Sequence, residues 1–235
     1  MSKRKPFEPL YIDNHLMVVN KPAGILAQAD ETGDPDILTL GKAYLKKRFG
    51  KPGKVYLGLV HRLDRPVSGV MVLARTSKAA ARLTEMFRER QVEKRYLAVV
   101  EGQISGTDHW RDYLLKDGRK VRTVAADHPK GKEARLSWQA IDTGASTSLV
   151  EVALHTGRPH QIRLQFASRG YPLVGDLRYD AKTRFDGINL ALHSYSLGIT
   201  HPTRREPMSF VVRPPQSWRG FHEKARNAFF ETCGD

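Results

Sequence analysis

The chain has 235 residues, with 39 lysines and arginines against 25 aspartates and glutamates, so its formal net charge is +14 at pH 7. No apolar run approaches the roughly 20 residues of a membrane-spanning helix, and no apolar signal core follows the basic first residues. Its single cysteine, Cys233, excludes an internal disulfide and a cysteine-based metal cluster. We therefore expect a cytoplasmic monomer that does not bind membranes and whose positive charge attracts nucleic acid, because a polyanion releases counterions on binding.

A β-hairpin and a helix are the first predicted elements. Residues 10–20 give two short strands around an Asp13–Asn14 turn, and a helix follows from Asp36 until Gly50 supplies a stop. Six cations with no acidic residue among them occupy the end of this helix and the next loop: Lys42, Lys46, Lys47, Arg48, Lys51 and Lys54. They form either a phosphate-facing patch or an ordinary solvated face.

A polar loop between two apolar runs is the central feature of the sequence. Residues 55–60 and 70–74 have the length and β-branched content of buried strands. The loop between them contains His61, Arg62, Asp64, Arg65 and Ser68. By its position alone, Asp64 is more often a turn-capping aspartate than a reacting group.

The remaining elements alternate between helix and strand. Thr76 or Ser77 can cap an amphipathic helix, and residues 96–100 then predict a strand. Residues 103–148 predict short strands with turns at 117–118 and 129–131, and 149–155 predicts another strand.

Residues 160–166 alternate with period two, which predicts a strand with Gln161, Arg163 and Gln165 on its polar face. An apolar strand at 190–192, proline-interrupted last strands and a short terminal helix complete the chain.

Motif spacing excludes several classes of site. The nearest pairs, His61 with Asp64 and His155 with His160, do not have metal-ligand spacing, so no metal is predicted. Neither a glycine-rich nucleotide cradle nor a Gly-x-Ser-x-Gly motif occurs. Composition and spacing alone therefore indicate a basic, mixed α/β protein that binds RNA or DNA.

The residue types within the motifs resemble those of a known family. His61–Gly69, with the sequence His-Arg-Leu-Asp-Arg-Pro-Val-Ser-Gly, resembles the His-Arg-Leu-Asp-x-x-Thr-Ser-Gly signature of RluA-type pseudouridine synthases, which isomerise uridine to pseudouridine within folded RNA. Four further blocks match in the expected order, namely Val18–Gly24, Lys94–Gly102, Thr156–Arg163 through Gly175–Asp176, and Leu192–Ser194 with His201–Pro202.

The resemblance implies a role for individual residues. Asp64 is then the catalytic aspartate, Arg163 its ion-pair partner and Tyr96 the ring stacked on the target uracil. The expected substrate-binding side chains are Arg62, His61, Arg65, Arg158 and Gln161. The sequence leaves open whether Asp64 attacks the sugar, adds to the base or removes the 2′ proton.

The same resemblance implies an α+β fold, with a mixed, largely antiparallel β-sheet, flanking helices and a central RNA-binding cleft. We expect one catalytic domain over residues 1–235, with 1–9 as a flexible basic tail and no S4 RNA-binding domain in front. Ribosomal or transfer RNA is the expected partner, without metal or cofactor. Val67 stands where the family has threonine, and we expect it to be a packing substitution.

Two other readings remain at this point. An RNA-binding or assembly factor on the same fold would share the charge but would not depend on catalysis. Metal-dependent phosphoester hydrolysis is disfavoured by the spacing of the ligand-type residues.

Overall fold

The computed structural model describes residues 7–118 and 120–233, which form two compact units. Unit 1 consists of the described residues within Met1–Val92 and Gly198–Phe210, and unit 2 of those within Glu93–Leu197 and Val211–Asp235. Most of the predicted basic tail lies outside the described residues, and its last residue, Pro9, already belongs to the first strand. In the described part of the chain, no helix is long and apolar enough to cross a membrane.

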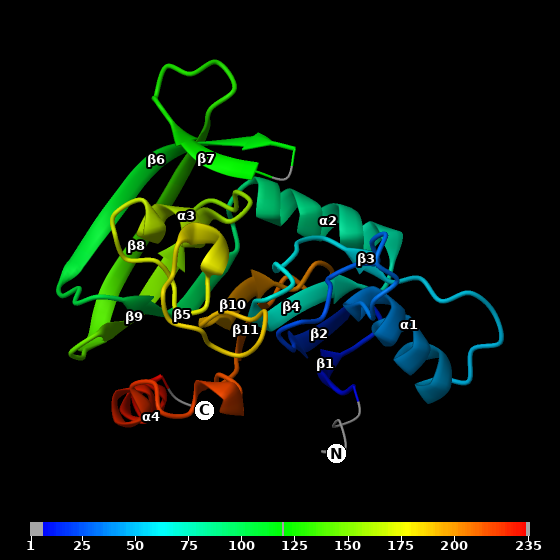
Figure 1. The fold of residues 1–235 in the computed structure, drawn as a ribbon. Helices are drawn as coiled ribbons and strands as arrows, with labels where there is room; N and C mark the ends of the chain where they lie inside the picture. Colours follow the sequence, from blue (N-terminus) through cyan, green and yellow to red (C-terminus); the bar gives the residue numbers. More distant parts are fainter. Residues whose placement is uncertain (1–6, 119, 234–235) are drawn as a thin grey trace. The chain divides into compact units, whose positions relative to one another are not determined.

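The strands of unit 1 begin with the predicted hairpin, formed by β1 (Pro9–Ile12) and β2 (Leu16–Lys21) (Figure 1). Asp13 sets the turn, because its carboxylate accepts hydrogen bonds from the backbone N–H groups of His15 and Leu16, both at 2.8 Å. β2 pairs antiparallel with β4 (Ser68–Ala74), in which every residue is buried. This register places the last residue of β2 opposite Gly69, beside the central loop.

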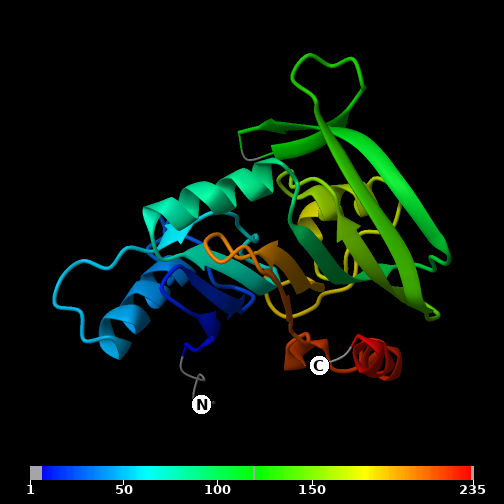
Figure 2. The same cartoon turned by 180° about the vertical axis from the view of Figure 1, so that it is seen from behind.

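Both helices of unit 1 begin where the sequence predicts, and the second begins at its predicted cap, Thr76. Asp36 accepts a hydrogen bond from the Thr39 N–H at the start of α1 (Ile37–Arg48), and Thr76 accepts one from the Ala79 N–H at the start of α2 (Ser77–Arg88). Such a cap satisfies an N–H group that the helix itself cannot. The view from behind in Figure 2 shows α2 running along the strands of unit 1.

The strand predicted at residues 55–60 is wrong in extent. Only β3 (Gly58–Leu59) pairs with β4, because the preceding residues serve other contacts. The Leu57 side chain packs so closely on α1 that a Cβ atom at Gly41 would lie 2.6 Å from it, whereas Tyr56 is exposed. The apolar run is therefore a helix contact followed by a two-residue strand.

Unit 2 is built on long antiparallel strands. They are β5 (Glu93–Glu101), β6 (Thr107–Asp117), β7 (Lys120–Val124), β8 (Lys132–Thr143) and β9 (Thr147–Leu154), paired in the order β5-β9-β8-β6-β7. The predicted turns at 117–118 and 129–131 are confirmed, but of the strands around them β7, with five residues, is short, whereas β6 and β8, with 11 and 12 residues, are long. Along β8, exposed polar side chains alternate with buried apolar ones. The strand therefore contains no continuous apolar run by which the sequence would reveal it.

The strand predicted at residues 160–166 is a helix, α3 (Gln161–Ala167). A window of seven residues satisfies both periods, and Gln, Leu, Arg and Ala favour a helix. Leu164 packs against apolar residues of β6, β7 and β8, and Phe166 lies edge-on to Trp110, with ring centroids 4.6 Å apart. Arg163 and Gln165 therefore do not share a polar strand face, and both are buried.

The last part of the chain connects the two units. After η1 (Leu177–Tyr179), β10 (Leu192–Thr200) belongs to unit 2 up to Leu197 and to unit 1 from Gly198, and it pairs with β11 (Pro207–Val211). The strand predicted at 190–192 thus begins only at its last residue. η2 (Gln216–Trp218) and α4 (Glu223–Thr232) then close a core cluster of unit 2 with the fully buried Trp218.

Candidate active site

Asp64 lies in the loop between β3 and β4 of unit 1 and is partly buried. Its carbonyl oxygen accepts a hydrogen bond from the N–H of Val67 at 3.0 Å, which closes a turn directly before the buried strand β4. Val67 itself is buried, as expected of a packing substitution. The carboxylate is thus carried by a short turn anchored in the core of unit 1.

A second segment of unit 1 ties this loop down from the other side. The Gly24 N–H donates to the Arg65 carbonyl oxygen at 2.8 Å, and the Arg65 Nε donates to the Gly24 carbonyl oxygen at 3.1 Å. Gly24 has φ +83, a left-handed conformation that glycine adopts without strain. The Lys-Pro-Ala-Gly turn and the Asp64 loop therefore form one structure, although they are separated by 41 positions.

Lys21, the last residue of β2, lies beneath this structure and is fully buried. Its Nζ donates to the carbonyl oxygens of Pro22 at 3.0 Å, Ile25 at 2.7 Å and Arg65 at 3.2 Å. An ammonium has three N–H groups, so these three acceptors fully satisfy the charged form.

Burial, reinforced by the positive charge of Arg65, lowers the pKa of Lys21 to about 7, while the negative charge of Asp64 opposes this shift. Lysine is almost never fully buried without a partner, and no sequence pattern predicts that Lys21 is buried. The only sign in the sequence that Lys21 is important is its place in the Val18–Gly24 block.

The other polar side chains of the loop differ in how far they are engaged. The His61 Nε2 accepts a hydrogen bond from the Val72 N–H at 3.0 Å, and its ring stacks on Phe87 with centroids 4.5 Å apart. The Arg65 guanidinium pairs with Asp34 at 2.7 Å. Arg62 is exposed. Of the three side chains, Arg62 is the one presented to solvent, whereas His61 and Arg65 shape the loop.

In unit 2, Tyr96 lies in β5 opposite Val152 of β9 and is 7% exposed. The strand prediction is confirmed here, and the backbone pairing of β5 with β9 fixes the position of the residue that carries the ring. A tyrosine ring held in a sheet presents a rigid π-face at little conformational cost.

Arg163 forms a buried, bidentate ion pair with Asp176. The Arg163 Nε lies 2.6 Å from Oδ2 of Asp176, and Nη2 lies 2.7 Å from Oδ1. Both side chains are buried, at 6% and 2% exposure. The guanidinium carbon also lies 5.2 Å from the ring centroid of Tyr179, whose hydroxyl is 2.8 Å from Nδ1 of His160.

This arrangement fixes both the charge and the orientation of Arg163. A fork of two parallel hydrogen bonds leaves the guanidinium plane little freedom, and arginine stays protonated even when buried. Gly175, at φ +88, permits the turn that delivers Asp176, since a Cβ atom there would lie 2.6 Å from the Asn189 carbonyl oxygen. Asp176 belongs to one of the sequence blocks of the resemblance, but its pairing with Arg163 is visible only in the structure.

Gln161 and Arg158 hold the turn before α3. The Gln161 Oε1 accepts hydrogen bonds from the Thr156 hydroxyl at 2.7 Å and the Arg158 N–H at 3.0 Å, and its Nε2 donates to the Arg135 carbonyl oxygen at 3.1 Å. The Arg158 Nε donates to the Glu133 carbonyl oxygen at 2.8 Å. The amide of Gln161 is therefore engaged inside unit 2, where it positions α3.

The structure thus places the expected site residues in two groups, one in each unit. The Asp64 loop of unit 1 holds Arg62, His61 and Arg65, whereas unit 2 holds Tyr96, Arg163, Arg158 and Gln161. Among residues 7–118 and 120–233, no group of three or more His, Cys, Asp or Glu side chains is placed to hold a metal ion.

Comparison with known proteins points to one family. Residues 15–168 match the family described as RNA pseudouridylate synthase. The chain is 32% identical over 223 residues to the ribosomal large subunit pseudouridine synthase D of Zymomonas mobilis, an alignment that covers 90% of this chain and 70% of that one. It is 34% identical over 212 residues to the ribosomal large subunit pseudouridine synthase C of Vibrio vulnificus, covering 85% and 63%.

A solved structure agrees with the sequence comparison. The structure titled human RNA pseudouridylate synthase domain containing 4 superposes with a TM-score of 0.76 at 25% identity, covering 93% of this chain and 92% of that one. The segment that matches the family, residues 15–168, includes the whole Asp64 loop and α3.

Proposed function

The chain belongs to the RNA pseudouridylate synthase family, and on this premise we propose that it converts a uridine of ribosomal RNA to pseudouridine with Asp64 as the catalytic carboxylate. The observation that carries the proposal is the family match over residues 15–168, which contains the His61–Gly69 signature. The large-subunit enzymes named among its relatives favour ribosomal RNA as the substrate.

The reaction exchanges one bond to the sugar for another. The bond between N1 of uracil and C1′ of the ribose breaks, the base turns, and C5 of the base bonds to C1′. C5 then loses its proton, and N1, which has left the sugar, gains one. The product is an isomer of the substrate, so the balanced reaction requires no oxidant and no second substrate. The base must leave the RNA stack to reach protein groups, and it must be retained while it is detached.

The residues of unit 1 supply the reacting carboxylate. A carboxylate must be ionised to attack a carbon or to accept a proton. Asp64 stands on a turn that Lys21 and Arg65 fix by hydrogen bonds to the backbone, so its position is set before the RNA arrives. We assign Arg62, the exposed neighbour, to holding the nucleotide that has left the stack.

The residues of unit 2 supply a ring and a fixed positive charge. We assign Tyr96 to stacking on the uracil, since an aromatic face retains a base without a fixed rotation. We assign Arg163 to stabilising the ionised form of Asp64, because an opposite charge favours a carboxylate. Asp176 is the positioning residue that orients Arg163.

The test is a map of pseudouridines in total RNA from cells with and without the gene, by carbodiimide modification and primer extension. The proposal predicts one or more positions in large-subunit ribosomal RNA that lose pseudouridine without the gene and regain it with the wild-type gene. An unchanged ribosomal RNA map would contradict it, and a loss confined to transfer RNA would contradict the assignment of substrate.

A matched complementation separates the enzyme from an RNA-binding or assembly factor of the same fold. The net charge of the protein favours such a factor as the second candidate. The Asp64→Ala gene should neither restore pseudouridine nor correct any growth defect of the deletion. Restoration of growth without pseudouridine would assign the biological role to binding rather than to catalysis.

A further inference from the structure

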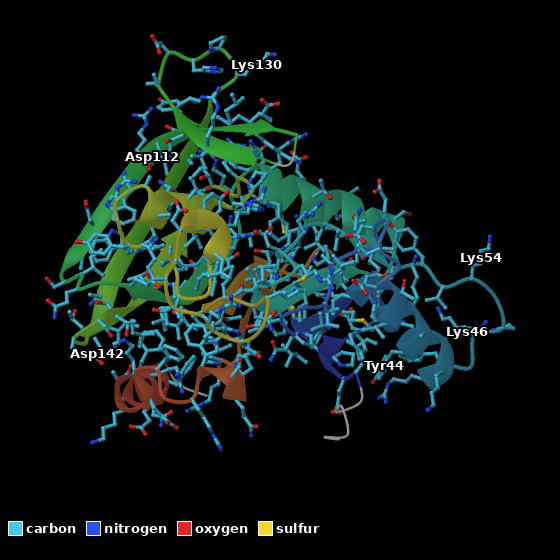
Figure 3. The ribbon with its side chains drawn as sticks, viewed as in Figure 1. Tyr44, Lys46, Lys54, Asp112, Lys130 and Asp142 are labelled. Atoms are coloured by element: carbon cyan, nitrogen blue, oxygen red, sulfur yellow. The ribbon has the colours of Figure 1, made fainter. Side chains whose placement is uncertain are left out.

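A continuous segment of unit 1 carries positive charge without any acidic residue. Between Asp36 and Asp64, the sequence contains seven cations and no aspartate or glutamate. Six of them lie on α1 and in the loop that follows, and each of these six is exposed: Lys42, Lys46, Lys47, Arg48, Lys51 and Lys54. Figure 3 shows Lys46 near the end of α1 and Lys54 on the loop that leaves it.

The charge of this segment is not neutralised within unit 1. None of the six cations forms an ion pair with a carboxylate in the described part of the chain, whereas Arg65, Arg88 and Arg204 of the same unit each form at least one. The three basic residues at the end of α1 also complement the negative end of the helix dipole, but one turn of helix does not account for six cations. An uncompensated patch of this kind attracts a polyanion.

Two large aromatic side chains lie among these cations. Phe49 is 46% exposed and Tyr56 is 48% exposed, although rings of this size are normally covered in a soluble protein. The Phe49 ring carries the guanidinium of Arg75 at 4.7 Å from its centroid, and Arg75 is in turn hydrogen-bonded to the Asp13 carbonyl oxygen. The exposed ring is therefore held in place rather than free to fold onto the surface.

The loop between the two aromatic residues is open. A Cβ atom at Gly50 or Gly53 would meet no other atom within 4 Å, and Gly50 has φ +57. A ligand can therefore approach the backbone at both positions. Cations interleaved with exposed aromatic rings on an open loop are typical of surfaces that bind unpaired RNA, with phosphates on the cations and bases on the rings.

We propose that residues 42–56 of unit 1 form an accessory RNA-binding surface that holds the phosphates and unpaired bases of the substrate RNA outside the target nucleotide. This inference rests on the proposed function for the identity of the RNA, but not for the binding itself. It predicts that affinity and catalysis can be separated, because no residue of this surface belongs to the Asp64 loop.

The experiment compares two triple variants with the same change in net charge. Lys46→Gln, Lys51→Gln and Lys54→Gln remove charge from the surface, and Lys78→Gln, Arg219→Gln and Lys224→Gln remove it from exposed positions elsewhere. Binding of a fluorescein-labelled oligouridylate is measured by anisotropy over a range of salt concentrations. The first variant should lose about tenfold in affinity, and its slope of log K against log salt should fall by about two, because each phosphate contact on single-stranded RNA contributes about 0.7.

The control variant should bind within about twofold of wild type and keep its salt slope. Equal losses in both variants, or no loss in the first, would overturn the proposal. Binding to phosphatidylserine vesicles is measured in parallel, and a loss confined to the vesicles would assign the surface to membranes instead and overturn it as well.

A third measurement separates this proposal from the proposed function. At saturating ribosomal RNA, the first variant should form pseudouridine at the wild-type single-turnover rate. If wild type forms none, the proposed function fails while the oligouridylate result stands. If wild type is active and the variant binds RNA normally, the surface proposal fails alone.

Discussion

Lys21 of unit 1 and Arg163 of unit 2 are buried cations of the candidate site, and they are stabilised differently. Lys21 of unit 1 donates to three backbone carbonyl oxygens, and burial lowers its pKa to about 7. Arg163 of unit 2 makes a bidentate pair with the carboxylate of Asp176. The lysine can lose its proton near neutral pH, whereas the arginine cannot. Unit 1 thus uses its cation to shape a loop, and unit 2 keeps a permanent charge in a fixed orientation.

The largest effect is expected from breaking the pair in unit 2. Asp176→Asn removes the carboxylate that holds the buried Arg163 guanidinium in a bidentate pair, so the free energy of unfolding should fall by about 3–5 kcal/mol in urea denaturation. Activity should fall by about a hundredfold, the loss that a misplacement of about 1 Å causes. A stability within 1 kcal/mol of wild type would contradict the importance of this pair.

A double variant tells the structural part of this effect from the catalytic part. Replacing Arg163 by Met and Asp176 by Leu exchanges the pair for apolar side chains and should recover most of the lost stability. Pseudouridine formation should not recover. A stable and active double variant would remove Arg163 from the mechanism.

A pH-dependent effect is expected from the cation of unit 1. The pKa of Lys21 is about 7 in the folded protein, against the ordinary lysine value of 10.5 in the unfolded chain, so between these values the unfolded chain binds more protons. Its contribution to the free energy of unfolding therefore rises with pH in this window, by up to about 1.4 kcal/mol per unit, while below pH 7 the burial of the charged amine is fully destabilising.

The Lys21→Met variant lacks this dependence. The difference in stability between wild type and variant should grow in favour of wild type from pH 7 to 10, as measured by urea denaturation at each pH. A constant difference would show that Lys21 keeps its proton throughout this range. All other titrating groups are common to both proteins, so they cancel in the comparison.

The smallest effect is expected at the surface ion pair of the loop. Asp34→Asn removes the carboxylate from Arg65 but leaves the hydrogen bond from the Arg65 Nε to Gly24. Both partners are partly exposed, so the loss of stability should stay below about 1 kcal/mol. A larger loss would mean that the loop is held by this pair rather than by Lys21.

The two regions also differ in how far sequence could anticipate them. The Asp64 loop, the strand of Tyr96 and the capped helices follow from local patterns and from the motif wording, and the structure confirms these elements. For residues 160–166 the pattern predicts a strand, because seven residues of mixed polarity satisfy both periods. Helix propensity and the packing of Phe166 on Trp110 make this segment a helix instead.

The partners of Lys21 and Arg163 could not be predicted for a different reason. Asp176 lies 13 positions from Arg163, and Lys21 reaches the Arg65 carbonyl oxygen across 44 positions. No periodicity connects such residues, because their contact depends on the completed fold. The buried amine of Lys21 also contradicts the general exposure of lysine, so composition argues against it.

The most direct test of the account is the activity of Asp64→Asn on the ribosomal RNA site mapped by deletion of the gene. Single-turnover pseudouridine formation is measured at saturating RNA, together with the RNA affinity and the urea midpoint of the variant. The account predicts no detectable product with affinity and stability close to wild type. Product formation at the wild-type rate would contradict the role of Asp64 and with it the proposed mechanism.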